Sequence, residues 1–171
     1  ATGVRVILQK PDIDAGRSFD WGKPSDDYAR YRDIYPPVLY DRLAALGIGV
    51  RGQRVLDLGT GTGVLPRNMY PFGARFTGVD ISAGQIEAVR RLAADAGTDI
   101  EFLIGAAEDM RFPSVTFDAA TACQCFIYFD TAPFLPLLST VLKVGGLLAT
   151  VLLNRLSDES RIAAAIACIF L

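Results

Sequence analysis

The chain has 171 residues, of which 51% are hydrophobic and 21% charged, and its formal net charge is −2. This length suits one domain with a substantial core, and the weak charge gives no electrostatic footprint for nucleic acid or for an anionic membrane surface. Charged residues interrupt every apolar stretch before it reaches membrane-spanning length and no signal-peptide pattern opens the sequence, so we expect a cytoplasmic protein.

The first predicted elements precede a glycine-rich stretch. Residues 1–27 lack clear periodicity, and we interpret them as an N-terminal arm in front of one domain over 28–171. Helical patterns follow at 28–32 and 37–46, with a break at Pro36-Pro37. Three leucines of the second helix are predicted to form its buried face: Leu39, Leu43 and Leu46.

Five short apolar runs then alternate with helical patterns. The predicted strands are 54–58, 74–79, 100–104, 117–122 and 147–153. The predicted helices are 64–70, one capped by Ser82 and ended by Gly97, 131–142 and one from Ser157 to about Ile169. This alternation is typical of an α/β fold with a doubly wound, mainly parallel sheet and helices on both faces.

The most informative stretch is Val55 to Gly63, in which an apolar run ends in an acid and three glycines spaced two apart. Such a turn into a helix lets a ligand approach the main chain closely. A dinucleotide fingerprint would need its third glycine at position 64, which is Val. Asp57 would repel a pyrophosphate but attract a cationic amino group. The alternative is a tight strand-to-helix turn that binds nothing.

Further candidates lie where the other strands end, which is where doubly wound sheets bind ligands. Asp80 closes the second predicted strand, and its carboxylate could accept hydrogen bonds from both hydroxyls of an adenosine ribose; the alternative is a loop acid that caps the next helix. Ile81 could lie against an adenine face or pack in the core. Glu108 and Asp109 follow the third strand, and solvated loop carboxylates are the alternative reading for both.

The sequence contains no histidine and three cysteines without metal-ligand spacing, namely Cys123, Cys125 and Cys168. The commonest general base and the commonest metal ligand are therefore both absent. We expect no metal site, buried cysteines in a reducing compartment, and chemistry that positions reactants.

Asp57 and the three glycines resemble the first motif of class I S-adenosylmethionine-dependent methyltransferases. The order of this motif, Asp80, the loop with Glu108, and Gly145-Gly146 resembles the small-molecule branch of that family over residues 54–153. The resemblance implies a Rossmann-like fold, S-adenosylmethionine as cofactor, and methyl transfer to a small-molecule acceptor by proximity and alignment. It assigns the cofactor to Asp57, Gly59, Thr60, Gly61, Gly63, Asp80, Ile81, Ala107, Glu108, Asp109, Gln124, Tyr28 and Arg32.

The chain departs from this family where the acceptor would bind. Relatives often carry an aromatic-histidine-aromatic run after the fourth strand, and this chain has Phe126-Ile127-Tyr128. No catalytic residue can therefore be named, and a non-catalytic cofactor-binding or partner subunit is the alternative function. A nicotinamide-dependent oxidoreductase ranks third, because Val64 breaks the dinucleotide pattern.

The second departure is at the C-terminus, where family members usually add a β-hairpin that appears to be missing here. The strand at 147–153 would then be an exposed apolar edge. We expect homo-oligomerisation through this strand or low solubility, or that the sequence is part of a longer protein.

Overall fold

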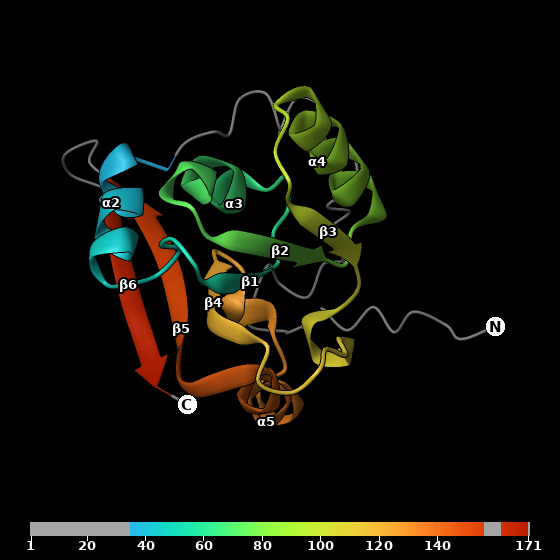
Figure 1. Ribbon diagram of the computed structural model, residues 1–171. Coiled ribbons are helices and arrows are strands. Elements are labelled where there is room, and N and C mark those ends of the chain that lie inside the picture. The colour runs from blue at the N-terminus through green and yellow to red at the C-terminus, as the bar shows by residue number, and fades with distance from the viewer. Residues whose placement is uncertain (1–34, 156–161, 171) are drawn as a thin grey trace.

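The computed structural model describes residues 35–155 and 162–170, with side chains described from 35 to 152 (Figure 1). Some predictions concern residues outside this described part. These are the N-terminal arm over 1–27, the helix over 28–32, and the candidates Tyr28 and Arg32.

A single twisted sheet organises the described part of the chain, with its strands in the order β3-β2-β1-β4-β5-β6. The strands are β1 Arg54–Leu58, β2 Arg75–Asp80, β3 Glu101–Ile104, β4 Phe117–Cys123, β5 Leu142–Arg155 and β6 Ile162–Phe170. The strands from β3 to β5 pair in parallel, and β6 runs antiparallel to β5. The predicted doubly wound, mainly parallel sheet is confirmed.

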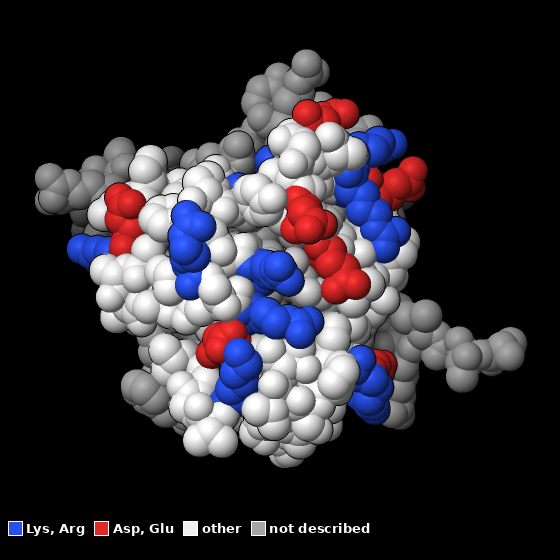
Figure 2. Space-filling view, in the orientation of Figure 1, with Lys and Arg blue, Asp and Glu red and all other residues white. Residues whose placement is uncertain are grey.

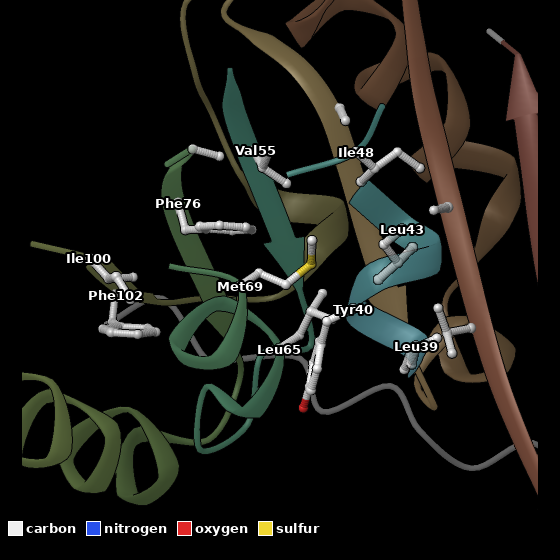
Figure 3. Close-up of a cluster of buried hydrophobic side chains, with 14 of the residues drawn as sticks. Leu39, Tyr40, Leu43, Ile48, Val55, Leu65, Met69, Phe76, Ile100 and Phe102 are labelled. Carbon is white, nitrogen blue, oxygen red and sulfur yellow. The ribbon is translucent and has the colours of Figure 1, made fainter. Parts of the chain in front are cut away.

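Helices cover both faces of this sheet. They are α2 Pro37–Ala45, α3 Val64–Met69, α4 Ala83–Asp95 and α5 Thr131–Val141, with short 3-10 turns at Tyr70–Phe72, Ala107–Asp109 and Phe126–Tyr128. Side chains of α2 and α3 pack on the face that carries Val55 and Phe76 (Figure 3). Side chains of α4 belong to the same cluster. Side chains of α5 pack on the opposite face with Leu56 and Leu58. The alternation along β1 therefore divides one core into two layers.

Local sequence signals set most helix ends. The Ser82 hydroxyl accepts a hydrogen bond from the Gln85 main chain at 3.4 Å, and the Asp130 carboxylate accepts one from Ala132 at 3.4 Å. Both side chains are N-caps, and the cap at Ser82 is the one predicted above. The predicted buried face of α2 is wrong at one position, because Leu46 lies just past the helix end and is 51% exposed.

The C-terminal part differs most from prediction. The helix predicted from Ser157 to about Ile169 is wrong, because residues 162–170 form β6 and pair along β5 from Arg155↔Ile162 to Leu147↔Phe170. The exposed edge predicted at 147–153 is wrong for the same reason, and oligomerisation through this strand loses its basis. Ladder hydrogen bonds along β5 prevail over the helix propensity of an alanine-rich segment.

The start of β5 is also irregular. The strand begins at Leu142, directly after α5, and not at Leu147 as predicted. Its pairing with β4 jumps from Phe117↔Leu142 to Ala119↔Leu147. Gly145-Gly146 therefore lies in a bulge inside β5, where Gly145 adopts a φ of +79°.

Two further observations concern surface charge and helix length. Lysine and arginine side chains are interspersed with acidic ones on the face drawn in Figure 2, without a broad field of one sign. Within residues 35–155 and 162–170, no helix has the length and apolar character needed to cross a membrane.

Candidate cofactor-binding site

The loops that follow four parallel strands meet at one edge of the sheet. The Thr60 main chain, after β1, donates a hydrogen bond to the Val79 carbonyl of β2 at 2.9 Å. The loop after β3 is joined to β2 by a bond from Gly105 to the Asp80 carbonyl, also at 2.9 Å. After β4, Gln124 donates to the Val151 carbonyl of β5 at 2.9 Å. The sequence-predicted candidates within the described residues therefore lie along this one edge of the sheet, where main-chain hydrogen bonds join the loops to neighbouring strands.

The glycine bend, residues 59–63, has a left-handed backbone at each of its three glycines, with φ of +60° at Gly59, +56° at Gly61 and +68° at Gly63. A Cβ at Gly59 would lie 2.6 Å from the Cys125 Sγ, and a Cβ at Gly63 would lie 2.5 Å from a Val89 methyl group. Backbone conformation and packing within the protein thus already require glycine here. The room that glycine leaves is filled by the protein's own side chains.

Asp57 lies at the end of β1, directly before the bend, and only 2% of it is exposed. Its two carboxylate oxygens accept hydrogen bonds from the Thr60 hydroxyl at 2.7 Å and from the Thr121 hydroxyl at 2.6 Å. Burial raises the pKa of Asp57 to about 6, and the two hydroxyls oppose this rise.

Among residues 35–152, the titratable neighbours of Asp57 are all neutral or acidic. Asp80 raises the pKa of Asp57 further, and Tyr35, Cys123 and Cys125 each interact electrostatically with Asp57. Burial raises the pKa of Tyr35 and of both thiols, so these three groups are protonated at neutral pH. No lysine or arginine among residues 35–152 pairs with Asp57. A buried negative charge without a counter-charge favours a cationic ligand.

Asp80 ends β2, and its carboxylate is hydrogen-bonded to the main chain of the bend. One carboxylate oxygen accepts a hydrogen bond from the Gly61 main chain at 2.8 Å, and the other accepts one from Ser82 at 2.8 Å. Burial raises the pKa of Asp80, and these two bonds oppose it. Among the described residues each oxygen accepts one of these two bonds, whereas a carboxylate can accept about four in all. Asp80 can therefore both hold the bend and bind ligand hydroxyls.

The candidate residues in the loop after β3 differ in how exposed they are. Ala107 is buried beneath the loop, and Asp109 is exposed. Glu108 is half-buried, and its carboxylate accepts a hydrogen bond from the Asp130 main chain at 2.9 Å, which joins the loop to the start of α5. Ile81 is half-buried next to Asp80. Of the two loop acids, Glu108 thus already has a structural partner.

The segment after β4 turns sharply beside the bend. Gln124 is half-buried and has a φ of +62°, an uncommon backbone conformation for a residue other than glycine. The Cys125 thiol donates a hydrogen bond to the Leu58 carbonyl at 3.1 Å. Phe126 and Phe129 follow and pack edge-to-face, with ring centroids 6.0 Å apart. This part of the site is mainly apolar.

One polar atom in the glycine bend is unsatisfied. The Thr62 hydroxyl is buried and has no hydrogen-bond partner among the described residues, although such groups are usually paired. Together with the carboxylates of Asp57, which no described cation neutralises, and of Asp80, it gives this edge donors and charges that suit a cationic amino acid joined to a nucleoside. The residues present fit S-adenosylmethionine. The described part contains no cluster of three or more side chains that could hold a metal ion.

Sequence reasoning missed three residues of this site. Thr121 lies on β4, 64 positions from Asp57, and only the pairing of β1 with β4 brings them together. Its one sequence signal is a lone hydroxyl in an otherwise apolar run. Tyr35 and Cys125 also face the site, and neither stands in a pattern that predicts this position.

Comparison with known proteins agrees with this geometry. A family model described as a methyltransferase domain matches residues 55–146, more than half of the chain. This chain belongs to the class I S-adenosylmethionine-dependent methyltransferase family. The resemblance noted from Asp57 and the three glycines is thereby confirmed at the level of the family.

One curated relative and two solved structures illustrate what this chain is similar to. The chain is 33% identical over 107 residues to a protein named ubiquinone biosynthesis O-methyltransferase from Methylocella silvestris, covering 62% of this chain and 42% of that relative. An S-adenosylmethionine-dependent methyltransferase structure from Aquifex aeolicus has a TM-score of 0.68 at 21% identity, covering 83% of this chain and 77% of that one.

A geranyl diphosphate C-methyltransferase structure from Streptomyces coelicolor, in complex with S-adenosyl-L-homocysteine, has a TM-score of 0.60 at 25% identity and covers 67% of this chain and 42% of that one. The chain spans about half the length of the curated relatives that it matches. The acceptors named for these relatives are therefore not assigned to this chain.

Proposed function

We propose that this methyltransferase chain binds S-adenosylmethionine at the glycine bend and transfers its methyl group to a small-molecule acceptor. The observation that carries the proposal is Asp57, a buried carboxylate under the bend that no described cation neutralises. Keeping such a charge in a core costs stability, and a cationic ligand would offset that cost. The unpaired Thr62 hydroxyl in the same bend supports a polar ligand there.

The proposed roles of the other residues follow from their positions. Asp57 attracts the positively charged amino-acid end by its field, because its own oxygens are bonded to Thr60 and Thr121. Asp80 accepts hydrogen bonds from the ribose hydroxyls with its remaining acceptor sites. Ile81 lies against the adenine ring, and Ala107 contributes main-chain groups to it.

The remaining candidates stay predictions. Asp109 is more available to an adenine amino group than Glu108, which already bonds to Asp130. Tyr28 and Arg32 are expected at the methionine carboxylate, and Gln124 is expected to contact the cofactor through its main chain or side chain. The cytoplasmic location also stays a prediction.

Catalysis would depend on alignment and not on a protein base. The bound cofactor supplies a methyl group that its sulfonium centre has already activated. Tyr35 and the two cysteines have raised pKa values and hold their protons at neutral pH, so none of them serves as a base there. An acceptor atom that ionises by itself or carries a lone pair needs no such base. Holding two reactants in line lowers a barrier by about 7–11 kcal/mol in favourable cases.

A non-catalytic cofactor-binding or partner subunit is the second candidate. The specific observation that favours it is the segment Phe126–Tyr128, which is apolar and lies beside the bend without a histidine. Both candidates require the same cofactor site, so they differ in turnover alone.

The experiment that separates these candidates has two steps. Calorimetric titration with S-adenosylhomocysteine tests the site, and a methyl-release assay then tests turnover across phenols, thiols, amines and carbon acids. Binding with turnover on at least one acceptor class supports the enzyme. Binding without any turnover favours the subunit, and no binding at all would defeat both.

A further inference from the structure

Two threonine hydroxyls hold the carboxylate of Asp57, and they come from different parts of the chain. Thr60 belongs to the glycine bend and donates at 2.7 Å. Thr121 is the direct partner of Asp57 in the parallel pairing of β1 with β4, is fully buried, and donates at 2.6 Å. Each oxygen of Asp57 thus receives one short hydrogen bond from a buried donor.

These hydroxyls are the only donors to Asp57 in the described part of the chain. The groups that face it from the surrounding elements are Asp80 on β2, Tyr35 before α2, and the thiols of Cys123 and Cys125 at the end of β4. None of them is a cation. Hydrogen bonds to the ionised form must therefore offset the burial that opposes it.

We propose that Thr121 is a positioning residue that keeps Asp57 ionised, and so sets the lowest pH at which the chain binds its cofactor. This inference rests on the proposed function, since it concerns the same site. Thr121 does not contact the ligand in this account. It acts through Asp57 by means of one buried hydrogen bond across two strands.

Cofactor binding is therefore coupled to the release of a proton from Asp57. Burial raises the pKa of Asp57 to about 6, so below that value a growing fraction of the free protein carries a neutral Asp57. Binding of a cation requires the ionised form and therefore releases a proton in this range. Removal of the Thr121 hydroxyl raises the pKa of Asp57 further, by about one unit, because a hydrogen bond to a charged group is lost.

The test is calorimetric titration of the full chain with S-adenosylhomocysteine between pH 5 and 8.5. We expect the wild-type affinity to fall below about pH 6, and that of Thr121→Val to fall below about pH 7. At pH 6 the variant should bind about fivefold more weakly than wild type, and at pH 8.5 the two should agree within about twofold. Thr121→Ser, which keeps the hydroxyl, should follow the wild type.

Thr77→Val is the matched control. Thr77 is a buried threonine on β2 whose hydroxyl donates to the Glu101 carboxylate at 3.2 Å, away from the bend. Its variant should leave the acid limit of binding unchanged. If Thr77→Val shifts the limit as much as Thr121→Val does, or if Thr121→Val leaves it in place, the inference is wrong.

Two further outcomes are distinguishable. If the wild type does not bind S-adenosylhomocysteine at any pH, the proposed function itself fails. If Thr121→Val does not fold, Thr121→Ala takes its place in the titration, and wild-type titrations in two buffers of different ionisation enthalpy test the linked proton on Asp57. Proton release that is greatest near pH 5–6 supports the role of Asp57, and binding without proton release between pH 5 and 7 overturns it.

Discussion

Replacing Asp57 by Asn should make the protein more stable at neutral pH, although it removes a residue of the proposed site. The pKa of Asp57 rises from 3.8 to about 6 on folding. Since one pKa unit corresponds to 1.36 kcal/mol, the ionised carboxylate costs about 3 kcal/mol of folding free energy above pH 6. Asn fills the same space, and its amide can bond to both Thr60 and Thr121, because hydroxyls donate and accept.

The pH dependence fixes the sign of this effect. Between pH 4 and 6 the folded protein holds a proton on Asp57 that the unfolded chain has lost, so the contribution of this residue to stability falls as pH rises. Above pH 6 neither state holds the proton, and the cost stays constant. The gain from Asp57→Asn should therefore be about 3 kcal/mol at pH 7.5 and below about 1 kcal/mol at pH 4.

Urea unfolding followed by circular dichroism at both pH values measures this gain. Asp109→Asn is the control, because Asp109 is exposed and should give no comparable gain. A variant that is no more stable than wild type at pH 7.5, or a gain that is the same at both pH values, would refute the reasoning. A gain accompanied by weaker binding of S-adenosylhomocysteine would indicate that the charge is retained for function.

Three further substitutions test the packing around the site. Gly63→Ala should lose about 2–5 kcal/mol of stability by urea unfolding, against about 1–2 for Gly47→Ala, because both have positive φ and only Gly63 faces a close contact. Glu108→Ala should lose about 1 kcal/mol, because the main chain of Asp130 loses its acceptor at the start of α5. Val115→Gly should raise the melting temperature, because Val115 is a β-branched, exposed residue with a φ of +55°.

Each of these substitutions has an outcome that counts against it. Equal losses for the two glycine variants would mean that Val89 moves aside at no cost. The control for Glu108 is Asp109→Ala, which removes an exposed carboxylate from the same turn, and equal losses for both variants would remove the role of the Asp130 contact. A lower melting temperature for Val115→Gly would show that its side chain contributes more than its backbone strain costs.

The central part of the fold was predictable because its signals are local. The run from Arg54 to Leu58 lies between glycines and is β1 with the predicted bounds. Ser82 and Asp130 cap the predicted helices, since capping depends on neighbours two or three residues away. The C-terminal segment was not predictable in this way. Its alanine-rich pattern suits a helix, and only the outer edge of β5 makes it a strand.

The candidate site likewise has a part that the sequence predicts and a part that it does not. The glycine bend and Asp80 stand out in the sequence, and the structure brings them together through the bond between Gly61 and the Asp80 carboxylate. The partner of Asp57 on β4 is 64 residues away, and strand register alone places Thr121 beside it. The partner of Glu108 likewise depends on how two loops meet. The sequence indicates which residue types belong to the site, but it does not indicate which distant segments pair.

The most direct test of the central claim is a crystal structure of this chain with S-adenosylhomocysteine. We predict that the amino-acid end of the ligand lies on the glycine bend above Asp57, with its ribose hydroxyls within hydrogen-bond distance of the Asp80 carboxylate. Ligand density away from the ends of β1 and β2, or a ribose that makes no contact with Asp80, would contradict the account.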